Sequence, residues 1–150
     1  MSSNCKNMEL FYELVQVALG QSETLSRNPS ATEWDELFTL SQKQAVVGVA
    51  LLAIEKMSQQ GQKPPVDLLL EWIGLSEQIR AQNILVDKRC VEITKLFADA
   101  GFRTCILKGQ GNALMYPDPS LRSSGDIDLW VEGSRKEIHD FVFAKCPITT

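Results

Sequence analysis

The sequence predicts an α+β fold, with a helical region over residues 1–100 and a smaller, strand-containing region over residues 101–150. Two observations predict it. Apolar residues recur at steps of three and four through the first hundred residues, which is the period of an α-helix. After Gly101 apolar and polar residues instead alternate, as in strands with one buried face. We therefore place the domain boundary near Gly101.

The composition excludes several classes of protein. Of the 150 residues, 44% are hydrophobic and 23% are charged, which is typical of a soluble globular chain. A net charge of -4 and scattered Lys and Arg argue against a general nucleic-acid surface. Four cysteines without a CxxC pair, beside one histidine, argue against a zinc site. With no signal peptide and no apolar run near the roughly 20 residues of a membrane span, we expect a cytoplasmic protein with free thiols.

Four helices are expected in the helical region. Their expected bounds are about residues 7–19, 32–42, 44–60 and 66–100. Gly20 ends the first, and Thr32 is a good N-cap for the second, with acidic residues in its first turn where the helix dipole favours them. Pro64-Pro65 opens the fourth, because proline fits the first turn of a helix. Gly101 is expected to end it.

The long helix over about 66–100 carries one apolar stripe. Its members are Leu68, Trp72, Leu75, Ile79, Val86, Cys90, Ile93 and Phe97. Gln82 fills the one gap in the spacing. Such a stripe is typical of a helix packed in a core or against other helices.

Shorter elements follow Gly101. We expect a strand over 102–107, a helix over 109–116, a turn at 117–119, a strand over 126–132, a helix over 133–144 and the start of another strand at 148–150.

Asp126 and Asp128 head the second of these strands. Residues two apart share one face of a strand, about 6–7 Å apart, while Ile127 and Leu129 point to the other face. Two carboxylates on a rigid strand suit a divalent cation. The same DxD pattern also occurs in dehalogenase-type phosphatases, in glycosyltransferases and in calcium loops. Alone, it is equally consistent with a turn cap followed by a solvent-facing aspartate.

The second motif is Lys108-Gly109-Gln110-Gly111, which follows the first strand and opens the short helix. Free N–H groups at a helix N-terminus favour anions. The motif matches neither the P-loop nor the dinucleotide fingerprint, so alone it also fits a plain strand-to-helix turn.

Taken together and in this order, the two motifs resemble a known family. The resemblance rests on Leu107-Lys-Gly, Tyr116-Pro-Asp-Pro, Leu121-Arg and Gly125-Asp-Ile-Asp-Leu. These segments are similar to the uncharacterised bacterial nucleotidyltransferases related to the DNA polymerase beta superfamily, over residues 107–131. The resemblance implies a mixed sheet flanked by helices, and metal-dependent transfer of a nucleotidyl group from a nucleoside triphosphate to an acceptor.

The resemblance also implies roles for individual residues. Asp126 and Asp128 would be the catalytic pair, holding Mg²⁺ (or Mn²⁺) ions about 3.5–4 Å apart. The candidates for binding nucleotide phosphates are Lys108, Gly109, Gln110, Arg122 and Ser124. Gln110 stands where the family turn usually carries serine or glycine. Lys108 is either a phosphate ligand or a solvated loop residue. Arg122 either pairs with phosphate or forms a salt bridge with Asp126 or Asp118.

One departure from the family pattern concerns the third carboxylate, which normally comes from a later strand. Glu132 lies about 13 Å from Asp128 along the strand, and Glu137 and Asp140 lie on the following helix. We therefore expect these 150 residues to be the amino-terminal part of a longer protein, with weak nucleotide binding and little turnover.

Two alternatives stay open: a glycosyltransferase that uses DxD to hold a nucleotide-sugar, and a non-catalytic helical interaction module with a degenerate nucleotide site. Dimerisation through the long helix would support the second. The sequence leaves the nucleotide and its acceptor open.

Overall fold

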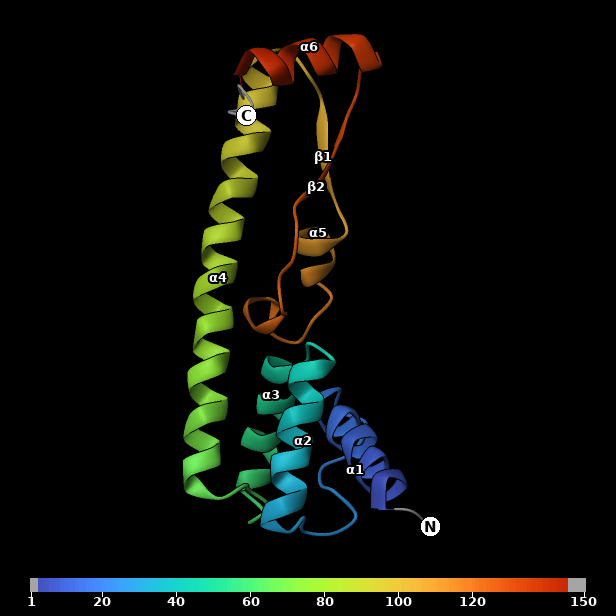
Figure 1. The fold of residues 1–150 in the computed structure, drawn as a ribbon, viewed down its shortest axis with the longest axis vertical. Helices are drawn as coiled ribbons and strands as arrows, with labels where there is room; N and C mark the ends of the chain where they lie inside the picture. Colours follow the sequence, from blue (N-terminus) through green and yellow to red (C-terminus); the bar gives the residue numbers. More distant parts are fainter. Residues whose placement is uncertain (1–2, 146–150) are drawn as a thin grey trace.

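The longest element of the fold is a helix of 34 residues. The computed structural model describes residues 3–145, and Figure 1 shows the other elements arranged along this helix, α4. The elements are α1 (Ser3–Ala18), α2 (Ala31–Lys43), α3 (Val47–Ser58), α4 (Val66–Asp99), β1 (Thr104–Leu107), α5 (Gly109–Ala113), the 3-10 helix η1 (Pro119–Leu121), β2 (Asp128–Val131) and α6 (Arg135–Lys145). The predicted α+β class and the predicted long helix are confirmed.

The main hydrophobic core lies where α1, α2 and α3 pack on the N-terminal part of α4 (Figure 1). Trp72 of α4 is fully buried at its centre, with its ring 4.9 Å from that of Phe38 and 6.4 Å from that of Trp34. Its indole N–H donates a 3.0 Å hydrogen bond to the carbonyl of Val47, at the start of α3. The apolar ring and its polar edge therefore both hold α4 against the bundle.

A smaller apolar cluster joins the other end of α4 to the strands and α6. The rings of Phe97, Phe102 and Phe141 lie 5.0–5.9 Å apart. Between the two clusters, β1 and β2 form an antiparallel pair beside α4 (Figure 1). The sheet seen in the described residues has these two strands only.

Several predicted boundaries differ from the structure. The N-cap of α2 is Ser30, not Thr32, because the Ser30 hydroxyl accepts from the Glu33 N–H while the Glu33 carboxylate accepts from the Ser30 N–H. This reciprocal capping box starts the helix earlier than predicted. Gly101 does end α4, with a φ of +86. The strand predicted at 148–150 lies outside the described residues.

Both strands are shorter than predicted, at four residues each. Pairing ends at Leu107 and Asp128 because Lys108, with a φ of 49, turns the chain away into α5. The predicted strand over 126–132 therefore begins at Asp128, and Asp126 precedes it without a partner in the ladder.

The middle of the α4 stripe is polar, which corrects one sequence prediction. Gln82 is exposed, and the gap between the two apolar ends is filled by the buried side chains of Ser76 and Asn83. Asn83 is 2% exposed. The physical reason is that this part of α4 faces a loop whose carbonyls require donors, rather than a helix. Among residues 3–145, no helix combines the length and apolar character needed to cross a bilayer.

Candidate functional site

Antiparallel pairing of β1 and β2 brings the two sequence motifs together. In the register, Leu107 is the partner of Asp128, so the residues after Leu107 lie beside the residues before Asp128. Gly109 starts α5 with a φ of 32, a conformation that favours glycine. A Cβ atom built on Gly109 would lie 3.4 Å from the carbonyl oxygen of Asp126. The glycine turn and the aspartate segment are therefore in direct backbone proximity.

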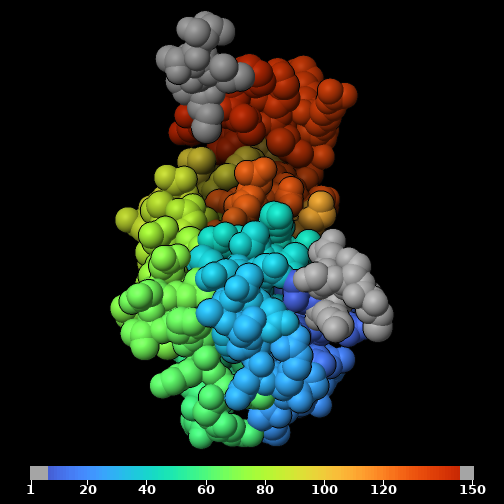
Figure 2. All heavy atoms as spheres, turned by 60° about the horizontal axis from the view of Figure 1, so that its bottom comes forward, coloured from blue at the N-terminus to red at the C-terminus, as the bar shows by residue number. Residues whose placement is uncertain are grey.

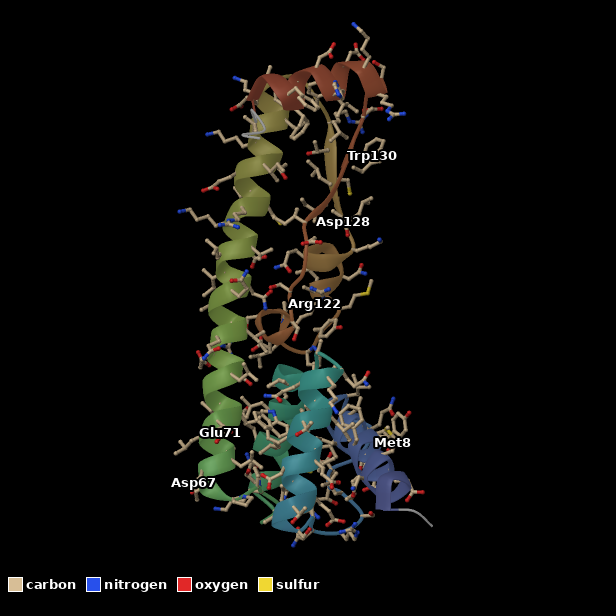
Figure 3. The ribbon with its side chains drawn as sticks, viewed as in Figure 1. Met8, Asp67, Glu71, Arg122, Asp128 and Trp130 are labelled. Carbon is tan, nitrogen blue, oxygen red and sulfur yellow. The ribbon has the colours of Figure 1, made fainter. Side chains whose placement is uncertain are left out.

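The two aspartates are exposed, and burial alternates along their segment. Asp126, Asp128 and Trp130 are exposed, whereas Ile127 and Leu129 are half-buried. Figure 3 shows Arg122, Asp128 and Trp130 in this order along the segment that returns beside β1. No hydrogen bond or ion pair holds either carboxylate within the described residues, so both are free to bind a cation. No cluster of three or more His, Cys, Asp and Glu that could hold a metal is found in the same part of the chain.

Other acids near the strand have separate partners. Glu132 forms an ion pair of 3.2 Å with Arg103. Glu137 accepts from the N–H and hydroxyl of Ser134, which lowers the pKa of that carboxyl and starts α6. These acids therefore serve local structure.

Arg122 has an unusual environment. Its side chain is half-buried, and its Nη1 atom is buried without a hydrogen-bond partner. The predicted alternative of a salt bridge from Arg122 to Asp118 is wrong, because Asp118 is paired with Arg80 at 3.2 Å. A buried guanidinium donor without a partner is costly, so an anion at this point would be stabilised.

The other predicted phosphate residues lie in different surroundings. Lys108 is exposed at the start of the turn. The side-chain amide of Gln110 donates to the Asp87 carboxylate of α4 and is thereby committed to the helix. Ser124 lines a groove against α4, next to Ser123 and Gln82. Gly109 lies close to the Asp126 backbone, Ser124 precedes Asp126 by two residues, and a phosphate role for all five residues stays a prediction.

A polar seam on α4 fixes the loop before the aspartates. We define it as Arg80, Asn83 and Asp87, which follow one face of the helix at steps of three and four. Arg80 bonds the carboxylate of Asp118 and the hydroxyl of Ser120. The Asn83 amide donates to the carbonyls of Ser120 at 2.7 Å and Arg122 at 2.6 Å, and Asp87 accepts from Gln110.

Charges and hydrogen bonds within the loop also hold it in place. The hydroxyl and N–H of Ser120 hold the pKa of Asp118 below its ordinary value, and Arg80 adds to the effect. From the opposite side Gly48 of α3 contacts Leu121, which is 2% exposed. The loop that precedes the aspartates is therefore anchored on both α3 and α4.

Comparison with known proteins identifies the family. Residues 30–141 match the model of a family described as an uncharacterised nucleotidyltransferase. The chain belongs to this family. The match begins at the N-cap of α2 and ends within α6, so it covers the long helix as well as both motifs. No curated protein and no solved structure matches the chain.

Sequence reasoning missed the polar seam of this nucleotidyltransferase family member. The signal was present in the helical spacing, because Asn83 lies four residues after Ile79 and three before Val86. A polar residue at a stripe position is buried only where it meets hydrogen-bonding partners. That signal predicts a contact with irregular backbone, although it does not say which loop makes the contact.

Proposed function

We propose that this chain binds a nucleoside triphosphate with a divalent metal and transfers its nucleotidyl group to an acceptor. One observation carries the proposal: in a member of a nucleotidyltransferase family, the glycine turn at Gly109 lies against the backbone of Asp126. A site for a polyphosphate and a site for a metal are thereby adjacent. We further propose that the family is related to the DNA polymerase beta superfamily, as the order of the motifs implies.

The chemistry of the donors fits Mg²⁺ or Mn²⁺. Carboxylate oxygens are the protein ligands that these hard cations prefer. Asp126 and Asp128 are both exposed and, within the described residues, neither is used in an ion pair. These two residues would hold the metal, which when bound would neutralise charge on the triphosphate and on the oxygens that exchange at phosphorus.

Positive charge and free N–H groups would bind the phosphates. Arg122 supplies the guanidinium donor that lacks a protein partner, and its planar fork suits phosphate oxygens. Lys108 supplies an exposed ammonium group beside the turn. Gly109 lets the phosphate approach the backbone closely, because it carries no side chain.

The polar seam would keep these groups in register. Asn83 binds the carbonyl of Arg122 itself, so the position of the guanidinium depends on α4. Among the described residues no third acid joins Asp126 and Asp128. In this proposal those residues would bind the metal and the triphosphate, and activation of the acceptor would be left to groups outside this cluster.

The test is calorimetric titration of ATP and GTP, each with and without Mg²⁺, into the wild type and into Asp126→Asn/Asp128→Asn. We expect the double variant to lose at least about tenfold in affinity for the Mg²⁺ complexes. Without Mg²⁺ the double variant should bind ATP and GTP at least as tightly as the wild type. Removal of two negative charges relieves their repulsion of the triphosphate.

Glu132→Gln is the matched control, since it removes a charge next to β2 from a residue paired with Arg103. It should leave binding within about twofold. Equal affinity of wild type and double variant for Mg·ATP and Mg·GTP would refute the metal assignment. Binding of sugar nucleotides, with no binding of triphosphates, would instead favour a glycosyltransferase.

A further inference from the structure

The pair of strands β1 and β2 has one face directed away from α4, which we call the open face. The register pairs Cys105 with Trp130 and Leu107 with Asp128, and residues directly opposite each other share a face. These four side chains are exposed, whereas the alternate residues of both strands are half-buried. Ile106, on the half-buried face, lines a groove with residues of α4. The four exposed residues therefore form the open face.

Trp130 on this face makes no contribution to the core. Its side chain is 49% exposed, whereas Trp34 and Trp72 are 2% and 0% exposed. Within residues 3–145 the Trp130 ring packs on no other aromatic ring and its N–H donates to no protein group, in contrast to Trp72. Cys105, directly opposite, has a small side chain that leaves the indole accessible.

The arrangement of the elements leaves the indole uncovered. Figure 3 shows the Trp130 side chain directed away from α4, on the strand that carries Asp128. Figure 2 shows the orange and red part of the chain projecting beyond the blue and green bundle, so α1–α3 do not reach it. A flat aromatic ring beside a candidate metal ligand is therefore available to a ligand.

The open face leads from Trp130 to the groups of the candidate site. Trp130 follows Asp128 by two residues, about 6–7 Å along the strand. It follows Asp126 by four residues, which span at most about 14 Å. Beyond Asp126 lies the glycine turn at Gly109. Between the two ends, Leu107 is 44% exposed and offers an apolar surface beside Asp128. An extended nucleoside triphosphate presents polyphosphate, sugar and base in the same order over a comparable length.

We propose that Trp130 stacks on the base of the nucleotide and favours purines over pyrimidines. The inference rests on the proposed function, because it takes the triphosphate to lie at Gly109, Asp126 and Asp128. Stacking tolerates every base, since each base has a π-face, and a purine covers more of the indole than a pyrimidine does. ATP and GTP should therefore bind with similar affinity, and both should bind more tightly than CTP and UTP.

The test compares Mg·ATP with Mg·tripolyphosphate, which carries three phosphates and no base. In calorimetric titrations the wild type should bind Mg·ATP at least about tenfold more tightly. Trp130→Ala should abolish this difference and leave the affinity for Mg·tripolyphosphate within about twofold, whereas Trp130→Phe should keep most of the difference. Phe143→Ala is the matched control, because Phe143 is also an aromatic residue that is 49% exposed but lies on α6. It should change neither affinity.

Tryptophan fluorescence gives a readout that a purely structural role of Trp130 would not affect. Trp34 and Trp72 are buried, so a bound base can reach the indole of Trp130 alone among the three tryptophans. Mg·ATP should quench the emission of the wild type and shield it from acrylamide, and Mg·tripolyphosphate should do neither. In Trp130→Phe the emission of the two buried tryptophans should remain and should not respond to Mg·ATP.

The outcomes separate this inference from the proposed function. Equal wild-type affinity for Mg·ATP and Mg·tripolyphosphate, or an unchanged affinity for Mg·ATP in Trp130→Ala, overturns base stacking and leaves the metal–triphosphate site intact. Failure of the wild type to bind either ligand overturns both. Loss of both ligands in Trp130→Ala shows that the indole supports the strands and overturns stacking. Equal affinity for purine and pyrimidine triphosphates overturns the preference.

Discussion

The side-chain amide of Asn83 donates a hydrogen bond of 2.6 Å to the backbone carbonyl of Arg122. A second bond of 2.7 Å, from the same nitrogen, reaches the carbonyl of Ser120. One buried amide in the middle of α4 thus fixes the loop that leads to Asp126. The helix that packs the N-terminal bundle also positions the candidate site.

Replacement of Asn83 tests this link. Asn83→Ala leaves two carbonyls without their donor and should lower the free energy of unfolding by about 2 kcal/mol in urea titrations. Asn83→Asp should cost more at neutral pH, because a buried carboxylate would then face those carbonyls. Gln82→Ala, at the exposed neighbouring position, should stay within about 0.5 kcal/mol of wild type. Equal effects at both positions would contradict the polar seam.

Gly109 is expected to be intolerant of a side chain. At a φ of 32 any side chain is strained, so Gly109→Ala should cost about 1 kcal/mol and shift the turn that lies against the Asp126 carbonyl. Affinity for Mg·ATP should fall by at least about tenfold, as measured by calorimetry. Gly125→Ala is the control next to Asp126, since a Cβ there meets nothing within 4 Å. Unchanged affinity in Gly109→Ala would show that the turn plays no part in binding.

Gly48 should be equally restrictive, for a different reason. A Cβ at Gly48 would lie 2.3 Å from the carbonyl oxygen of Leu121, so α3 or the loop must move. Gly48→Ala should therefore destabilise the fold by about 1–3 kcal/mol, even though alanine favours helix. Gly74→Ala, where space is open, should instead raise the melting temperature in dilute protein. A stabilising effect of Gly48→Ala would contradict the close packing of α3 on Leu121.

Acid sensitivity is expected at the start of α2. Hydrogen bonds from Arg27 and then from the Ser30 N–H lower the pKa of Glu33 from 4.5 to about 2. Because the folded-state pKa is the lower one, this carboxylate stabilises the fold fully above the unfolded value and loses its contribution as pH falls toward about 2. The difference in melting temperature between wild type and Glu33→Gln should shrink over that interval. A difference that stays constant with pH would rule out this ion pair as a source of stability.

Local sequence patterns predicted the helices well. The steps of three and four between Leu68 and Phe97 predicted α4 almost to its ends, and Gly101 ends it as expected. Thr32 was the wrong N-cap because the choice between two hydroxyl residues depends on which one Glu33 can reach. Side-chain geometry decides between them, and the spacing of residues in the sequence does not reveal that geometry.

The site was harder to predict than the fold. Antiparallel pairing of the adjacent strands β1 and β2 brings together the two motifs, which are separated in sequence. Gln110 was expected at phosphate, yet its amide binds Asp87, a residue that no pattern connects with it. The role of Asn83 was hidden for the same reason, because burial of a polar side chain depends on a contact distant in sequence.

Paramagnetic broadening by Mn²⁺ tests the central claim most directly. With ATP present, substoichiometric Mn²⁺ should broaden the backbone amide signals of Gly109 and of residues 126–128 first, while signals of α1–α3 stay sharp. Broadening that is strongest elsewhere, for example around Glu13 and Glu33, or that persists at residues 126–128 in Asp126→Asn/Asp128→Asn, would contradict a metal–nucleotide site at the aspartates.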